Sequence, residues 1–238
     1  MSHCNVTPAL SIRNLGAYFD VNMGMMTHIK RLVRASFYQL RLIRAIRRSI
    51  PTYTAIRLVN SFVASKIDYC NSLLAGLPAY QLEKVQSILN YAASLICGRG
   101  KYDHVTPLLR DDLHWHRIPQ RVRYKSCLLV YKAINGLSPS YITSYCRSIS
   151  SVQGRSTLRS AAHNHLVIPR SKTKSGDRSF SVAGPSACKN LLDFIKTSTS
   201  VEQFNRSWRH TYLRNHTAND YLCIIVPLSL TLLMFTEL

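Results

Sequence analysis

Apolar residues recur at steps of three and four along most of this chain, which is the spacing that gathers them on one face of an α-helix. Between residues 24 and 48, for example, Ile29, Leu32 and Ile43 share such a face. Prolines at positions suited to a first helical turn mark the beginnings of later segments. The pattern predicts a set of helices: residues 24–48, 51–74, 78–97 and 119–134, a short helical turn from Pro139, and a last helix after Ser200.

The stretch DYCNSLLAGLP, residues 68–78, joins two of these helices and places a cysteine beside a tyrosine. It could be a reactive-thiol site or a helix joint. Cys70 continues the apolar stripe of the helix before it, and cysteine is among the residue types most often buried. Gly76 can take the left-handed conformation that ends a helix, and Pro78 can begin the next one. We interpret the stretch as a helix joint with Tyr69 or Cys70 facing the core.

Two further regions have the pattern of β-structure. Residues 11–20 predict a short strand that is interrupted by Gly16. Residues 165–169 and 178–182 flank a basic turn and predict a small hairpin. The expected fold is therefore mainly α, a helical bundle with a short N-terminal strand and a small β-hairpin near residues 165–182.

The charge of the chain indicates a polyanionic partner. Its 238 residues include 31 Lys and Arg but only 11 Asp and Glu, which gives a formal net charge of +20. Such an excess repels itself unless phosphate groups of nucleic acid or an anionic membrane surface lie nearby. The charge alone does not distinguish these two partners.

The helix expected over residues 24–48 concentrates this charge, with seven cations and no acid. At 100° per residue, five of the cations fall within about 40° of one line opposite the apolar face. A solvated face is one interpretation, but phosphate contact would offset the mutual repulsion. Phe37 lies on the same face, where it could stack on a base or fold back onto a neighbouring helix. The candidate nucleic-acid-binding residues are Lys30, Arg34, Phe37, Arg41, Arg44 and Arg48.

No pattern in the sequence predicts catalysis, a metal or a cofactor. The seven cysteines are scattered and include no pair at zinc-ligand spacing, which favours a reduced, intracellular protein. Asp111 and Asp112 are an adjacent acidic pair in an expected loop, without a third carboxylate to hold metal ions. Four histidines lack further ligands at metal spacing, so we expect structural roles for His114, His116, His163 and His165.

The C-terminal segment 221–235 is apolar, but it is only 15 residues long and contains Pro227. A membrane-spanning helix normally needs about 20 apolar residues. Membrane association is therefore the less favoured alternative.

Several blocks, taken in order, resemble the C-terminal part of reverse transcriptases from non-LTR (LINE-type) retrotransposons. The match covers about residues 10–214, and its specificity comes from the number and order of the blocks. The blocks are SIRNLGAYFD, HIKRLVRASFYQLRLIRAIR, SKIDYCNSLLAGLP, DHVTPLLRDDLHW, YKAINGLSPSYI, VIPRSKTKSGDRSFSVAGP and VEQFNRSWRHTYL.

This resemblance implies four parts. Residues 1–22 would be a remnant of the palm end, residues 23–146 a thumb-like helical domain, and residues 147–216 a C-terminal extension, whereas residues 217–238 are an apolar tail without a counterpart in the family. The Tyr-x-Asp-Asp turn of the polymerase active site is missing, so the resemblance implies no polymerase chemistry. The expected role is backbone binding to an RNA or DNA duplex. A basic membrane-associated protein and a non-functional transposon remnant are the alternatives.

Overall fold

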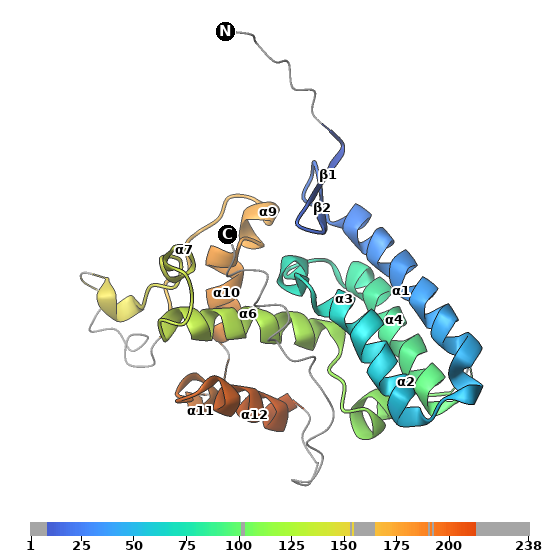
Figure 1. The fold of residues 1–238 in the computed structure, drawn as a ribbon. Coiled ribbons are helices and arrows are strands. Elements are labelled where there is room, and N and C mark those ends of the chain that lie inside the picture. Colours follow the sequence, from blue (N-terminus) through green and yellow to red (C-terminus); the bar gives the residue numbers. More distant parts are fainter. Residues whose placement is uncertain are drawn as a thin grey trace.

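The computed structural model describes residues 9–100, 103–152, 154, 165–189, 191 and 193–212. In this part of the chain the fold is mainly helical, with one two-stranded antiparallel sheet near the N-terminus (Figure 1). The expectation of a mainly α fold is confirmed. The apolar segment 221–235 lies outside the described residues. Within the described ranges, no helix combines the length and the apolar character needed to cross a membrane.

The first helices follow the sequence pattern closely. Helix α1 spans Met26–Ile46 and continues into the short 3-10 helix η1, Arg47–Ser49. Its inner stripe, which includes Ile29, Leu40 and Ile43, is buried as the apolar spacing predicts. Helix α4 spans Ala79–Cys97 between Pro78 and the left-handed Gly98. Proline and glycine thus limit this helix as expected.

The second helix is shorter than predicted. It runs through α2 (Thr52–Val59), the π-helical turn η2 (Asn60–Ala64) and α3 (Ser65–Asp68), and it ends at Asp68 and not at Leu74. Tyr69 is extended and Cys70 is left-handed, and a separate 3-10 turn, η3, covers Asn71–Leu74. The Asp68 carboxylate accepts hydrogen bonds from Arg121 at 2.7 Å and from Asn71 at 3.4 Å. These contacts hold the chain in a turn where local spacing alone favoured continued helix.

The loop expected over residues 103–119 contains helical turns. Helix α5 spans Val105–Pro107 and the π-helical turn η4 spans Leu108–Asp112. Leu108 and Leu109 are buried there against the first helices, which stabilises the turns through tertiary packing.

The remaining central helices begin and end close to the predicted positions. Helix α6 spans Ile118–Ile134, and the left-handed Gly136 follows its end. The turn after Pro139 is helix α7, Ser140–Thr143, and a 3-10 turn, η5, covers Ile149–Ser151.

The β-structure differs from the prediction in both places. Residues 11–20 form two strands, β1 (Ser11–Asn14) and β2 (Ala17–Asp20), because Leu15 and Gly16 both have positive φ and turn the chain back.

The hairpin predicted near residues 165–182 is wrong. Leu166 makes a single bridge to Ser148, and the second run enters helix α10, Phe180–Lys189. Thr173 caps the preceding short helix α9 (Lys174–Asp177) by accepting from the Gly176 backbone N–H at 3.0 Å. The buried Gly184 faces α6, where an added Cβ would lie 3.0 Å from Val130. Close helix packing therefore outweighs the β-like sequence.

The C-terminal elements are α11 (Asp193–Lys196) and α12 (Val201–Tyr212). The Ser200 hydroxyl accepts from the Gln203 backbone N–H at 3.1 Å, which is one half of a capping box. The Gln203 side chain accepts from Thr199 instead of completing the box at Ser200. Phe204 and Trp208 of α12 are buried.

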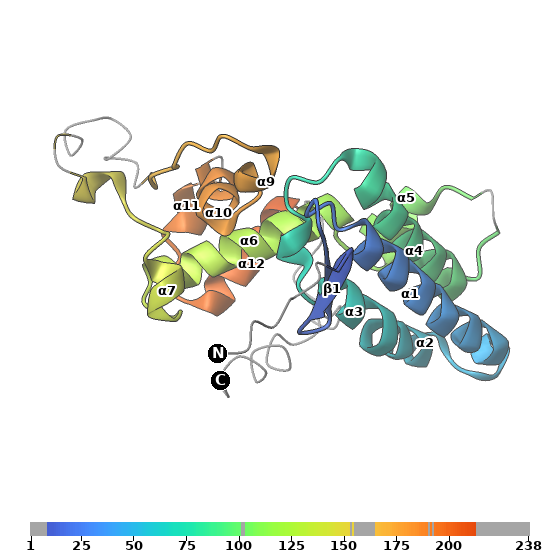
Figure 2. The ribbon, with the colours of Figure 1, turned by 90° about the horizontal axis from the view of Figure 1, so that it is seen from above.

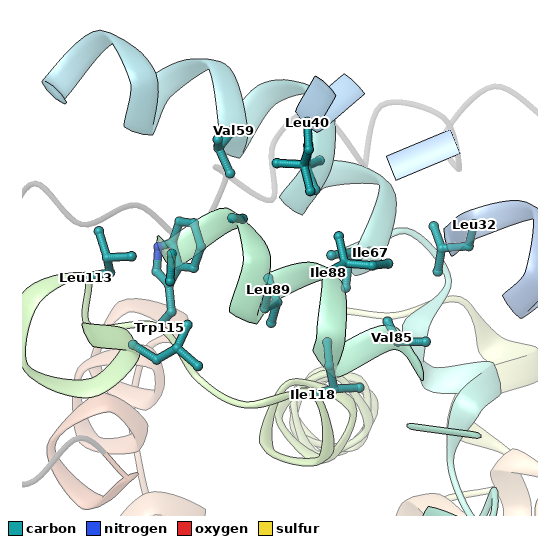
Figure 3. Close-up of a cluster of buried hydrophobic side chains, with 14 of the residues drawn as sticks. Leu32, Leu40, Val59, Ile67, Val85, Ile88, Leu89, Leu113, Trp115 and Ile118 are labelled. Atoms are coloured by element: carbon teal, nitrogen blue, oxygen red, sulfur yellow. The ribbon is translucent and has the colours of Figure 1, made fainter. Parts of the chain in front are cut away.

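Two large hydrophobic clusters share helix α6, and a small third cluster includes its residues Val130 and Ala133. The first cluster contains residues of α1, α2, α3 and α4 and of the segment that leads into α6. Figure 3 shows part of it around Ile88, Trp115 and Ile118. The second packs α12 and α11 against later residues of α6, including Tyr124 and Tyr131. Figures 1 and 2 show α12 running beside α6, whereas α1, α2, α3 and α4 lie at one end of α6. The predicted domain boundary at residue 146 stays a prediction.

Candidate nucleic-acid interface

The outer side of α1 carries most of the predicted binding residues. Its inner side is fixed in the first hydrophobic cluster, and α1 lies along the outer edge of the bundle in Figure 1. The segment from Met26 to Ile46 contains no acid. Among the described residues, none of the five predicted cations forms an ion pair, and all are exposed: Lys30, Arg34, Arg41, Arg44 and Arg48.

Two of the six predicted residues turn toward helix α4. The Phe37 ring is half-buried, with its centre 5.6 Å from that of Tyr91. Arg44 Nη1 donates to the Tyr91 hydroxyl at 3.1 Å. Phe37 therefore folds back onto the neighbouring helix, which was one of its two expected placements. Arg44 marks the edge of the basic face, whereas Lys30, Arg34, Arg41 and Arg48 form its centre.

An aromatic residue that the sequence pattern did not single out lies on the exposed side of α1. Tyr38 is 58 % exposed. It follows Arg34 by four residues and precedes Arg41 by three, so these side chains are neighbours on the helix surface. Leu42, at the next turn, is also half exposed. Applying the 100° rotation to Tyr38 as well as to Phe37 would have identified it.

The basic face continues onto the N-terminal hairpin. The Arg31 guanidinium lies 4.4 Å from the ring centre of Tyr18 in β2, and Arg31 Nη1 donates to the Tyr18 hydroxyl at 3.4 Å. Arg13 in β1 approaches the same ring at 6.0 Å. Arg13 and Arg31 are both exposed. The two cations were not predicted, because nothing local in the sequence brings residues 13, 18 and 31 together.

Arg47 has a structural role, unlike its exposed neighbour Arg48. Its guanidinium donates to the carbonyl oxygens of Leu95 at 3.2 Å and Ile96 at 2.7 Å, near the end of α4. It also donates to Ile50 O at 3.0 Å. Backbone carbonyls at a helix C-terminus lack intrahelical partners, so Arg47 satisfies them and fastens α1 to α4.

A second basic segment leads into α9 and includes its first residue, Lys174. Arg170, Lys172 and Lys174 are exposed. The segment is tied back to the start of α1 by Arg178, whose Nη1 donates to Met23 O at 2.6 Å. This turn is the alternative place for phosphate contacts.

The cysteine and the acids that could carry chemistry do not assemble into a site. Burial raises the pKa of the Cys70 thiol, which keeps it in the unreactive protonated form. Asp111 is exposed and pairs with its neighbour Arg110 at 2.9 Å. Within the described ranges, no three His, Cys, Asp or Glu side chains are grouped so that they could hold a metal ion.

His116 is buried and neutral. Burial, followed by the nearby charges of Arg121 and Arg209, lowers its pKa to about 4. The structural role expected for His116 agrees with this environment, and His163 lies outside the described residues.

Comparisons of this chain with protein-family models, with curated proteins and with solved structures found no match.

Proposed function

We propose that this chain is a catalytically incomplete fragment of a LINE-type reverse transcriptase whose remaining activity is non-specific binding to the backbone of an RNA or DNA duplex. The ordered sequence blocks support the family part of the proposal. The exposed cations of α1, which have no acid beside them, support the binding part and carry it.

The physical basis is the release of counterions. A cation that contacts a phosphate displaces a condensed counterion, so the affinity falls as salt is added. Contacts to phosphates fix the position of a protein on the duplex but do not read its sequence. Helix α1 with Arg34 and Arg41 along one side, continued by Arg48 in η1, is suited to such contacts. We therefore expect strong salt dependence and little sequence preference.

The test is a salt titration of duplex binding with the triple variant Arg34→Gln, Arg41→Gln and Arg48→Gln. The slope of log affinity against log salt should fall by about 2 to 3 units, since each B-DNA phosphate contact contributes about 0.9. Fluorescence anisotropy of a labelled duplex gives the affinity at each salt concentration. Two duplexes of different sequence should give the same slope.

The matched control removes the same charge elsewhere, through Arg170→Gln, Lys172→Gln and Lys174→Gln. Its slope should change less than that of the α1 variant. A loss confined to this control would move the interface to the turn before α9. Deleting residues 217–238 should leave duplex binding unchanged. Weak duplex binding together with tail-dependent binding to anionic vesicles would support the membrane alternative and contradict the proposal.

A further inference from the structure

We infer that the α1 face binds a single-stranded segment of nucleic acid in addition to duplex backbone, with Tyr38 as the residue on which an unpaired base stacks. This inference rests on the proposed function and specifies its ligand. It concerns a junction, where a single strand leaves a duplex.

The first argument is the composition of the exposed surface of α1. Beside the cationic row lies an apolar strip at helical spacing, in which Tyr38 is 58 % exposed, Leu42 50 % and Ile46 46 %. Residues four apart are neighbours on a helix, so the strip is continuous over about two turns. Phosphates and sugars of a duplex backbone would leave such a strip exposed to water. Unpaired bases would cover it with apolar surface.

The second argument is the state of the Tyr38 ring. Other tyrosines near the basic face have partners, because Arg31 covers Tyr18 and Phe37 packs on Tyr91. Within the described part of the chain, Tyr38 has neither a ring contact nor a hydrogen bond. Its ring is therefore available to a ligand, and bases that stack on an aromatic side chain must be unpaired.

The third argument is the position of Tyr38 among the cations. Arg34 and Arg41 lie one turn to either side of it and carry no ion pair to any described residue. A base on the ring would thus have its phosphates beside two guanidinium groups. Interleaved cations and aromatic rings are the arrangement that binds single strands with little sequence preference.

The experiment compares three labelled probes of equal phosphate number: a blunt duplex, a duplex with a single-stranded overhang, and a single strand. Tyr38→Ala should weaken binding to the overhang and to the single strand by about 5- to 150-fold, the range for loss of one stacked base. Its affinity for the blunt duplex should stay within about twofold of the parent chain, and its salt slope should not change, because no charge is removed.

Two further variants make this result specific. Tyr38→Phe keeps the ring and should restore single-strand binding. Tyr141→Ala, which removes a tyrosine that is 59 % exposed on α7, should have no effect. Figure 2 shows α7 and α1 at opposite ends of the molecule. Circular dichroism of each variant excludes unfolding as the cause of a loss.

The inference and the proposed function can fail separately. Absence of duplex binding, or an unchanged slope in the arginine variant, would contradict the proposed function. If the parent chain binds the duplex as expected but Tyr38→Ala changes the affinity for all three probes equally, only the inference is overturned. Loss of binding to vesicles containing phosphatidylserine while single-strand binding is unchanged would also overturn it, since the strip would then contact lipid.

Discussion

The turn of the N-terminal hairpin contains a leucine in an unfavourable backbone conformation. Leu15 has φ 44° and Gly16 has φ 82°, as the two central residues of a type I′ turn require. A left-handed conformation suits glycine and asparagine but costs other residues about 1 kcal/mol or more. The Leu15 side chain is 62 % exposed, so little packing offsets this cost.

Leu15→Asn should therefore raise the free energy of unfolding by about 1 kcal/mol. The hydrogen bond from the Tyr69 hydroxyl to Leu15 O is made to the backbone and is retained. Urea denaturation measures the change. Gly16→Ala is the opposing control, because its Cβ would lie 3.3 Å from Tyr69 Cε1 at φ +82° and should destabilise the protein. A less stable Leu15→Asn variant would show that the leucine side chain contributes packing.

Phe37 was predicted on the exposed basic face of α1, but it is half-buried against Tyr91, and Tyr38 is the exposed aromatic residue. Successive residues on a helix are separated by 100°, so a stripe is predicted well but its edges are not. Phe37 lies at the edge of the stripe and turns onto Tyr91. The four central cations were predicted correctly as exposed, because they lie opposite the buried residues. The contact of Arg31 with Tyr18 depends on the hairpin and could not be predicted locally.

At the level of elements, prolines and glycines predicted the ends of α4 and α6 well, whereas the end expected near Gly76 was wrong, because the second helix ends at Asp68. Helices α4 and α6 begin and end within about two residues of the expected positions, which is ordinary uncertainty for helix ends. The errors occur where distant residues decide the structure. Arg121 contacts the end of α3, and buried leucines stabilise η4. Residues 180–182 are helical because α10 packs on α6.

Arg178 is the strongest example of such a distant contact. Its guanidinium donates to three carbonyl oxygens in the N-terminal half: Met23 O at 2.6 Å, Leu73 O at 3.2 Å and Ala75 O at 3.2 Å. It thereby connects the segment before α10 to the turn between β2 and α1 and to the region of η3. Gly76 is required beside it, because a Cβ at that position would lie 2.8 Å from Arg178 Cγ.

Arg178→Lys should lower the free energy of unfolding by about 2 kcal/mol, because lysine cannot direct donors to three separate carbonyl groups. Hydrogen exchange should become faster in η3, while the middle of α4 stays protected. Arg170→Lys is the matched control at an exposed position and should have little effect. Equal stability of the two variants would mean that apolar packing alone holds the segment in place.

At the level of the whole molecule, the two hydrophobic clusters meet around the first turns of α6. His116 lies at this junction, and both of its ring nitrogens are buried without a hydrogen-bond partner among the described residues. Arg121 Nε donates to the His116 carbonyl oxygen at 3.0 Å, and Arg209 of α12 is close enough for its charge to act on the ring. A proton on His116 would therefore place a third cation between these two arginines in a region that excludes water.

This arrangement predicts a loss of stability in acid. The pKa of His116 is lowered to about 4, whereas in the unfolded chain it is near 6.5, so between these values the unfolded state binds the extra proton. The free energy of unfolding should therefore decrease as the pH falls from 7 to 4, and His116 should account for about 3 kcal/mol of that decrease.

His116→Phe removes the titrating group, so its unfolding free energy should depend less on pH over this range, whatever its stability at pH 7. Urea denaturation at several pH values measures the slope. His28 is also buried, and burial lowers its pKa, so the stability of both the parent and His116→Phe should depend on pH through His28. The difference between their two pH dependences is the contribution of His116. His210→Gln, at an exposed position on α12, controls for loss of a histidine. Parallel curves for the parent and His116→Phe would show that His116 is protonated in the folded state without cost, through access to water at the junction.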